Sequence, residues 1–131
     1  MKLSRIKLIN LRIIKNSKGD IMKYLDKNNP IFKSFGEVYF SEIKKNMTKG
    51  WILHKKSSCF LAVPFGKVKF TFSEKLKGKK KIIIIGSKNY KLIFLPPKIW
   101  FKFTSITGKS LVVNTINKVH DESETLKFPI T

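Results

Sequence analysis

Short runs of alternating apolar and polar residues dominate the segment 35–73 and restrict the chain to a β-rich fold. Val38 and Phe40 alternate with Tyr or Ser, and the run 68–72 alternates in the same way. Alternation with a period of two places apolar side chains on one face of a strand and the others on the opposite face. We therefore expect strands at both places, with the apolar residues directed into a core.

A third strand is predicted between these two runs, where Gly50 and a Lys/Ser cluster bound a short apolar stretch. Gly50, Ile52 and His54 are expected on one face of this strand. Trp51 and Leu53 are expected on the other face. Because this strand carries one of the two histidines in the chain, it is the first place to look for chemistry.

Further short strands are predicted, each bounded by turn-forming residues such as Pro-x-Gly or Pro-Pro. They cover residues 60–63, 82–85, 92–95, 99–103 and 111–115, with one or two more within 1–14. The β-branched run 82–85 favours a buried strand, and the polar stretch 74–81 an exposed hairpin loop. With turn signals roughly every 8 to 12 residues and no helical stretch, the pattern predicts an all-β sandwich or barrel of the jelly-roll type.

The length of 131 residues fits one domain with a real core. We expect a strand and loop lead-in over 1–34, a jelly-roll core over 35–116 and a polar tail over 117–131. No apolar run approaches the roughly 20 residues of a bilayer span, and the N-terminus lacks the features of a signal peptide. The single Cys59 excludes an internal disulfide, fits a cytoplasmic location and is expected to be a small buried hydrophobe.

The net charge of +20 invites a nucleic-acid interpretation. However, 26 of the 28 basic residues are Lys, and only Arg5 and Arg12 can form the planar fork that reads base edges. The lysines are scattered along the chain, apart from a dense run over 75–81. We interpret most of them as a solvated lysine-rich surface, with an anionic ligand or surface as the alternative.

Several motifs occur in a specific order: GEVYFSEI, KGW-x-x-HKK, LAVPFGKVKF, NYKL-x-x-LPPKIWFKF and a closing HD. In this order they resemble the short homologues of dTDP-4-dehydrorhamnose 3,5-epimerase, from about Lys18 to Glu124. The resemblance implies a double-stranded β-helix of the cupin type, usually a homodimer, that needs no cofactor. Members of that family act on dTDP-linked 4-keto-6-deoxy sugars that supply cell-surface polysaccharides.

The resemblance also implies residues that bind the substrate. Lys18 and Lys49 stand where the family has cations near the nucleotide phosphates, and a Lys ammonium binds phosphate as a point charge. Lys56 is a further candidate for positive charge near the sugar. Trp51 and Trp100 are candidates for stacking on a base or sugar, with a place in the core as the alternative.

The catalytic pattern of the family is altered. The usual base position is Ile52, and His54 lies two residues further on the same face; related 3,4-ketoisomerases carry His at both positions. The usual Tyr acid falls at about Val113, and another family His falls at Phe101. Removing a proton beside a ketone needs a base and a group that stabilises the enolate. We take His54 as the candidate base, with Lys49 or Lys56 supplying positive charge.

Tyr39, on a facing strand, is the candidate acid. His54 has an alternative role as a polar residue that recognises the ligand, and His120 is expected to be structural. No metal site is expected, since only two histidines are present and Ile52 interrupts the pair.

The sequence therefore leaves two main alternatives for the function. One is a sugar-nucleotide isomerase or epimerase, and the other is a non-catalytic cupin that binds a nucleotide-sugar or glycan. A third is non-specific association with polyanions, which predicts steep salt dependence.

Overall fold

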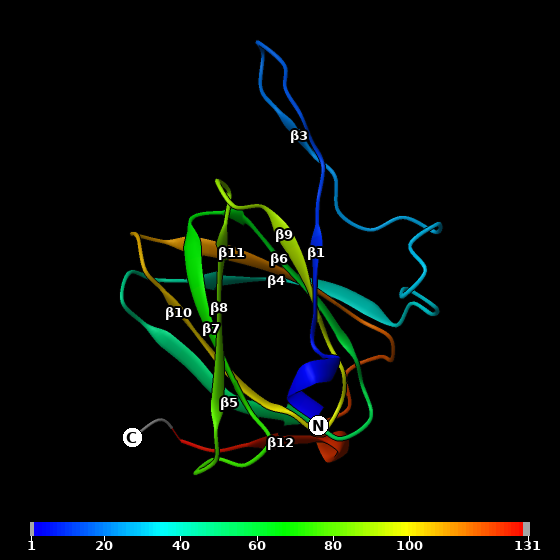
Figure 1. The fold of residues 1–131 in the computed structure, drawn as a ribbon, viewed down its shortest axis with the longest axis vertical. Coiled ribbons are helices and arrows are strands. Elements are labelled where there is room, and N and C mark those ends of the chain that lie inside the picture. Colours follow the sequence, from blue (N-terminus) through cyan, green and yellow to red (C-terminus); the bar gives the residue numbers. More distant parts are fainter. Residues whose placement is uncertain (1, 130–131) are drawn as a thin grey trace.

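Two antiparallel five-stranded sheets pack face to face in the computed structural model, which describes residues 2–129 (Figure 1). The first sheet has the order β1-β9-β6-β11-β4, and the second has the order β12-β5-β10-β7-β8. The strands of the first sheet are β1 (Lys7–Asn10), β4 (Glu37–Ile43), β6 (Cys59–Phe65), β9 (Lys91–Leu95) and β11 (Ser110–Ile116). Those of the second are β5 (Thr48–His54), β7 (Lys67–Ser73), β8 (Lys80–Gly86), β10 (Trp100–Ser105) and β12 (Thr125–Lys127).

Three small elements complete the fold. A 3₁₀ helix, η1 (Lys2–Arg5), precedes β1, and another, η2 (Glu122–Glu124), precedes β12. A separate hairpin of β2 (Ile13–Ile14) and β3 (Ile21–Met22) projects beyond the sandwich (Figure 1). No α-helix occurs among the described residues, and no helix there has the length and apolar character needed to cross a membrane. The predicted jelly-roll architecture is confirmed.

Aromatic residues of β7 and β10 form the centre of the core. Phe70 stacks on Phe103 with ring centroids 5.5 Å apart, and Phe103 stacks on Phe101 at 5.9 Å. Phe72 lies beside Phe70 at 6.1 Å, and all four rings are buried. Such offset aromatic pairs add to the free energy gained by burying their apolar surface. The prediction that the apolar residues of the run 68–72 point into the core is confirmed.

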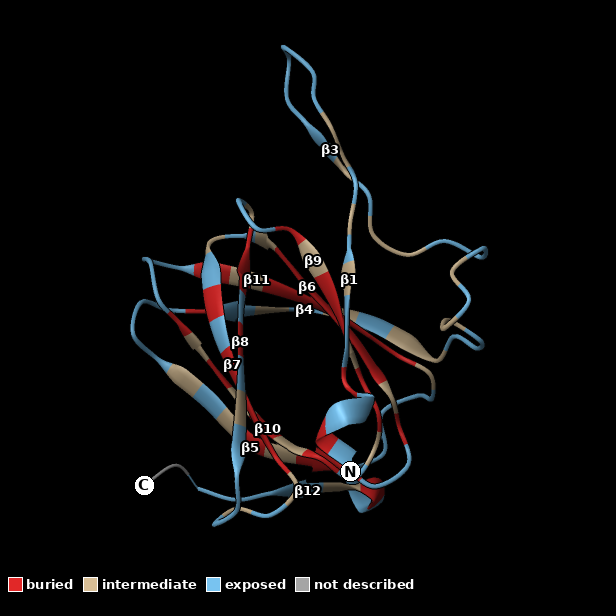
Figure 2. Cartoon of the chain, in the orientation of Figure 1, coloured by how far each residue is buried: buried red, intermediate tan, exposed pale blue. Residues whose placement is uncertain are grey.

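The prediction for β4 is wrong about which face points inward. Val38 and Phe40 are 45% and 66% exposed, whereas Tyr39 between them packs against the core (Figure 2). Alternation shows which residues share a face but does not identify the inner face. Here the inner face of β4 borders a cavity into which several polar groups converge, so the polar residues of β4 point inward and its apolar residues outward.

The predicted strand at 82–85 is present, but the prediction that it is buried is correct for only one of its faces. In β8, Ile83 and Ile85 are buried, while Ile82 and Ile84 are 54% and 40% exposed. The cause is that β8 pairs only with β7 and forms an edge of the second sheet, so that Ile82 and Ile84 on its outer side remain in solvent. One face of an antiparallel sheet can remain in solvent in this way.

The segment after β11 returns to the second sheet. Strand β12 pairs with β5, with Thr125 opposite His54 and Lys127 opposite Ile52. Asp121 caps η2, and its carboxylate accepts hydrogen bonds from the backbone N–H and the hydroxyl of Ser123. The segment 121–127 is therefore held against β5, beside the histidine of that strand.

Candidate functional site

A cavity of about 370 Å³ lies between the two sheets, where β4 and β11 face β5, β10 and β12. Its polar lining consists of Glu37, Tyr39, Ser41, Lys49, His54, Asn114, His120, Thr125 and Lys127. Its apolar lining consists of Ile52, Leu61, Phe101, Phe103 and Val112. A mostly apolar cavity with a few converging polar groups is the usual form of a small-molecule site.

The most distinctive group in this cavity is a buried histidine paired with a buried carboxylate. His54 is 5% exposed and Glu124 is 7% exposed. Nδ1 of His54 lies 3.2 Å from Oε1 of Glu124. The carboxylate accepts the Nδ1 proton, so the neutral imidazole carries its free lone pair on Nε2. Nε2 has no hydrogen-bond partner among residues 2–129, which leaves it available to a ligand.

Glu124 is fixed by several donors from the end of β5. Its carboxylate accepts hydrogen bonds from the backbone N–H of Lys56 at 2.8 Å and from the Ser57 hydroxyl at 2.8 Å. Burial works against ionisation of Glu124, but these hydrogen bonds and nearby His54 outweigh it and lower the pKa of the carboxyl. Glu124 is therefore ionised at neutral pH and holds the imidazole ring of His54 in one orientation.

The pKa of His54 is lowered from its ordinary value of 6.5 because burial disfavours the imidazolium, although Glu124 acts in the opposite direction. His54 is thus neutral at physiological pH. A neutral, buried imidazole whose Nδ1–H is held by a carboxylate has the form of a general base.

Tyr39 presents its hydroxyl from β4, on the sheet opposite His54. Its oxygen accepts a hydrogen bond of 3.0 Å from the Asn114 side-chain amide. Burial raises the pKa of Tyr39 to about 12, so the phenol remains protonated and can donate to a ligand. Asn114 is buried and its Oδ1 has no partner among the described residues.

Lys49 reaches the cavity because β5 is irregular. Ile52 lies opposite Phe101 and Gly50 lies opposite Lys102, so Trp51 is an additional residue in the pairing with β10. Such a β-bulge shifts the alternation by one residue. Gly50 has a φ of +119°, and a Cβ there would lie 2.7 Å from the carbonyl oxygen of Phe101. The prediction that Gly50 shares the face of Ile52 and His54 is wrong, since Lys49 takes that place.

The structure brings together three of the predicted site residues: His54, Tyr39 and Lys49 all line the cavity. Lys56 contributes its backbone N–H to Glu124 but is not among the residues that line the cavity. The other predicted binding residues lie elsewhere.

Trp51 is on the outer face of the second sheet, where the ammonium groups of Lys102 and Lys80 lie 4.8 Å and 5.7 Å from its ring centroid. Trp100 alternates with cavity-lining Phe101 and also faces outward. Lys18 lies on the projecting β2–β3 hairpin, away from the cavity of its own chain (Figure 1).

The three apolar residues at the family's proton-transfer positions, Ile52, Phe101 and Val113, do not all lie in the cavity. Ile52 and Phe101 line the cavity, but Val113 is directed to the other side of β11, where it packs with Ala62 and Tyr90. Its neighbour Asn114 is the residue that enters the site. Sequence reasoning missed Asn114, Glu124 and the cavity position of His120. Nε2 of His120 lies 3.0 Å from Oε1 of Glu122.

The described residues contain no group of three His, Cys, Asp or Glu side chains that could hold a metal ion. Cys59 is free and fully buried, as predicted, and burial raises the pKa of its thiol to about 12. The thiol is therefore a packing residue and has no nucleophilic character at neutral pH.

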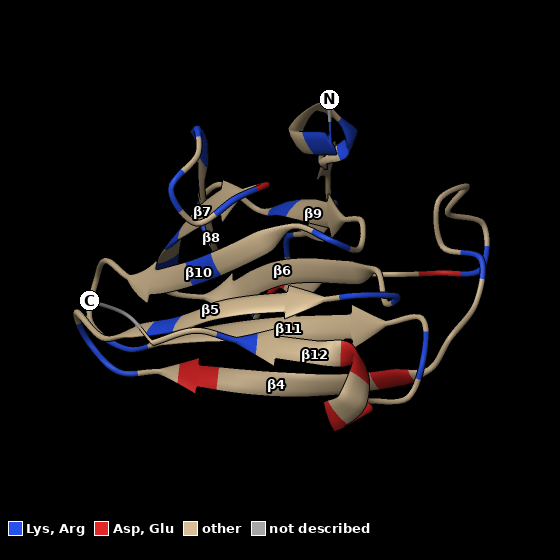
Figure 3. Cartoon of the chain, turned by 90° about the horizontal axis from the view of Figure 1, so that it is seen from below, with Lys and Arg blue, Asp and Glu red and all other residues tan. Residues whose placement is uncertain are grey.

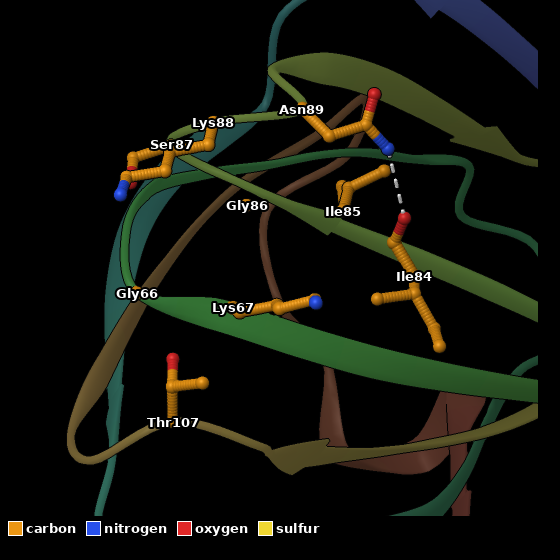
Figure 4. A pocket seen from close by; sticks show the side chains of 9 residues that line it. All are labelled: Gly66, Lys67, Ile84, Ile85, Gly86, Ser87, Lys88, Asn89 and Thr107. Atoms are coloured by element: carbon orange, nitrogen blue, oxygen red, sulfur yellow. Dashed lines mark hydrogen bonds between the residues drawn. The ribbon is translucent and has the colours of Figure 1, made fainter.

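A second hollow of about 770 Å³ lies where β7 begins and β8 ends, beside Gly66, Lys67, Gly86 and Lys88 (Figure 4). It contains no histidine, carboxylate or tyrosine, so it lacks a group for proton transfer at neutral pH.

Comparison with known protein families identifies a match that covers almost the whole chain. The model of the FdtA family, described as WxcM-like, C-terminal, matches residues 4–127. The chain belongs to the FdtA family. No curated protein matches this FdtA-family chain.

Solved structures resemble this FdtA-family protein over most of their length. A dTDP sugar isomerase from Desulfovibrio desulfuricans is 29% identical, with a TM-score of 0.90 over 95% of this chain and 84% of that one. QdtA, a sugar 3,4-ketoisomerase from Thermoanaerobacterium thermosaccharolyticum in complex with TDP, is 25% identical. Its TM-score is 0.77 over 95% of this chain and 88% of QdtA.

A dTDP-6-deoxy-D-glucose-3,5-epimerase from Legionella pneumophila, in complex with dTDP-4-keto-L-rhamnose, shares the fold at 13% identity. Its TM-score is 0.82 over 94% of this chain and 72% of that one. The resemblance to short 3,5-epimerase homologues is therefore confirmed, and the structural neighbours of this FdtA-family protein comprise both epimerases and ketoisomerases of dTDP-sugars.

Proposed function

We propose that this protein is an isomerase of a dTDP-linked 4-keto-6-deoxyhexose, with His54 as the base. The observation that carries the proposal is the buried His54–Glu124 pair in the wall of a cavity that also contains the Tyr39 hydroxyl. Two solved relatives at 25% identity or more are a dTDP sugar isomerase and a 3,4-ketoisomerase. They favour 3,4-ketoisomerisation over 3,5-epimerisation.

The proposed reaction moves the carbonyl from C4 to C3. Nε2 of His54 takes the proton from C3, the C–H electrons form a C3=C4 double bond, and the former carbonyl oxygen O4 accepts the negative charge. The Tyr39 hydroxyl donates a hydrogen bond to O4 and stabilises the enolate. The O3 hydroxyl proton is then transferred to O4, the new carbonyl forms at C3, and the electrons of the C3=C4 bond take the proton that the imidazolium returns to C4.

The dTDP portion is assigned to the rim of the cavity. Lys49 and Lys127 both line it, and the ammonium of Lys49 donates a 2.7 Å hydrogen bond to the Ser41 hydroxyl. An exposed ammonium of this kind binds a diphosphate as a point charge. The single cysteine is a free buried thiol, which fits a cytoplasmic enzyme that supplies surface polysaccharides.

A homodimer belongs to the same proposal. The outward-facing Val38 and Phe40 form an apolar area on edge strand β4, and such areas are common in subunit interfaces. Lys18 is too far along its projecting hairpin to serve its own cavity (Figure 1), so a substrate-binding role for Lys18 requires a neighbouring copy. Trp51 and Trp100, which face outward, are left without a role in this reaction.

The test is proton exchange at the sugar. Incubation with dTDP-4-keto-6-deoxyglucose in deuterated water, followed by NMR, reports loss of the ring proton at C3 even if little product accumulates. We expect exchange in the native protein and a loss of about 10²- to 10⁴-fold in His54→Asn, because general base catalysis contributes that much. His120→Asn should lose less than about tenfold, since its Nε2 is occupied by Glu122 at the rim.

A binding protein without turnover is the second candidate, supported by the apolar Ile52 and Phe101 in the cavity wall. Saturation of the protein by the sugar nucleotide with no exchange at any ring position would select this function. Equal exchange in native protein and His54→Asn would also overturn the assignment of the base.

A further inference from the structure

The outer face of the second sheet mixes lysines with exposed apolar side chains. Paired residues in a sheet share a face, so the register defines two rows: Lys102, Thr71 and Ile82, and next to it Thr104, Lys69 and Ile84. We call this surface, together with Lys67 and Trp100, the lysine–isoleucine face. It is distinct from the cavity, because the alternate residues Phe70, Phe72, Phe101 and Phe103 point to the interior.

The apolar part of this face is substantial. Ile82 and Ile84 are 54% and 40% exposed, and β8 is an edge strand that pairs only with β7. At the opposite side of the sheet, Leu126 and Phe128 are 41% and 49% exposed. Exposed aliphatic side chains grouped on one sheet face indicate a surface that is covered by a partner.

The charge of the second sheet has a single sign. None of its five strands contains an Asp or Glu. Between Ile43 and His120 the chain has 18 lysines and one acid, Glu74, whose carboxylate accepts the backbone N–H of Leu3. Figure 3 shows acidic residues on β4 and η2 and one beside the end of β7, but none within β7, β8 or β10. The partner of this face is therefore anionic.

A second copy of the chain does not fit, because face-to-face packing would bring lysines against lysines. Single-stranded nucleic acid fits poorly. The ring of Trp51 is 9% exposed and lies under Lys80 and Lys102, so it offers no open face for base stacking. The exposed apolar residues of β8, Ile82 and Ile84, are instead aliphatic and have lysines around them, as in surfaces that enter the lipid headgroup region.

We propose that the lysine–isoleucine face binds the surface of an anionic lipid bilayer. Ile82 and Ile84 would enter the boundary between headgroups and acyl chains, while Lys67, Lys69 and Lys102 contact lipid phosphates. The hollow beside Lys67, Ile84 and Lys88 adjoins this face and can seat a headgroup (Figure 4). Juxtamembrane lysines each contribute to binding through the negative surface potential. This inference is independent of the proposed reaction.

The test uses the whole protein and vesicles of phosphatidylglycerol mixed with phosphatidylcholine, compared with phosphatidylcholine alone. We expect co-sedimentation with the anionic vesicles and a decrease as salt is raised. Trp51 and Trp100, the only two tryptophans, both lie on the outer side of this sheet. Brominated phosphatidylglycerol should therefore quench their fluorescence, which reports contact through this face.

Three double variants separate the face from the overall charge. Lys67→Gln with Lys69→Gln should lower the partition coefficient about 10- to 30-fold, from roughly tenfold or less per lysine. Lys23→Gln with Lys27→Gln removes the same charge from exposed residues near the N-terminal hairpin and should lower it less than about threefold, because screening limits the effect over distance. Ile82→Thr with Ile84→Thr keeps the β-branched side chains and should weaken vesicle binding by about tenfold or more.

Several outcomes would overturn the proposal. They are the absence of vesicle binding, an equal effect of the two lysine pairs, and full binding by the double threonine variant. Preferential binding of a single-stranded oligonucleotide, with no quenching by brominated lipid, would assign the face to nucleic acid instead. Circular dichroism on each variant separates lost binding from lost folding.

Discussion

The interior of the sandwich has two halves that share strand β10 but differ in how they are filled. Under β7 and β8, Phe70 and Phe72 pack directly against each other and against aliphatic side chains. Between β4, β5 and β12, the buried residues include His54, Asn114 and Glu124, and a cavity remains. Close packing gives stability, and buried polar groups beside an unfilled space cost stability but can act on a ligand. The two halves should therefore respond differently to mutation.

The largest effect is expected in the packed half. Phe70→Ala should lower the free energy of unfolding by about 3–5 kcal/mol, because it removes a fully buried ring and leaves a cavity. Urea unfolding measures this change. Phe65→Ala removes a ring that is 59% exposed and should cost less than about 1 kcal/mol. If Phe70→Ala also abolished sugar exchange in the fraction that remains folded, the two halves would not be separable.

In the polar half, Glu124→Gln should affect chemistry more than folding. A glutamine amide can donate to Nδ1 of His54 and favour the tautomer whose Nε2 carries the proton, which removes the base. We expect about a 10²- to 10⁴-fold loss of exchange, as for other carboxylates that orient a catalytic histidine.

A purely structural role for Glu124 would leave the pH profile of the remaining exchange unchanged. Because the carboxylate raises the pKa of His54 against the effect of burial, its removal should move the acid limb of the exchange profile to lower pH. An unchanged acid limb would contradict the assignment of Glu124 as a positioning residue.

Tyr39→Phe tests the opposite wall of the cavity. Loss of one hydrogen-bond donor to a developing oxyanion typically costs about 10²- to 10³-fold, and we expect a decrease in kcat near the lower end of that range. The substrate KM should change little, since the rest of the cavity wall is retained. A decrease in binding with unchanged kcat would assign Tyr39 to recognition.

The positions of the strands could be predicted from the sequence, because alternation and turn residues are local signals. The family resemblance pointed to His54, and Tyr39 was predicted to face it from another strand; both line the cavity. The inner face of β4 could not be predicted, since the alternation of Val38 and Phe40 is equally regular whichever side is buried. Lys49 points into the cavity because Trp51 is an additional residue in β5 that shifts the alternation. Only the pairing of β5 with β10 reveals this shift.

Glu124 had no sequence signal as a partner of His54. It lies 70 residues away in a polar stretch, and its role depends on β12 pairing with β5. Asn114 was missed for a related reason, because the family comparison pointed to its neighbour Val113, one position off the inner face of β11.

The smallest expected effect is on stability as the pH falls. The pKa of His54 in the folded protein is below 6.5, so the unfolded chain binds that proton more readily, and stability is lost as the pH falls below 6.5. The lowered pKa of Glu124 adds a loss as the pH falls below 4.5. Thermal unfolding of native protein and His54→Asn between about pH 8 and pH 5 should show a flatter dependence in the variant. A parallel dependence would show that His54 is not the group responsible.

The pairing of β12 with β5 determines when His54 acquires its carboxylate partner during synthesis of the chain. The ribosome makes His54 early, but the carboxylate that orients it is made only after both sheets have most of their strands. During synthesis, the sandwich can close around a cavity whose imidazole is still free to rotate. The orienting contact for that ring would then arise only when the segment 121–127 docks, so that the strands of both sheets are made before the imidazole is fixed in place.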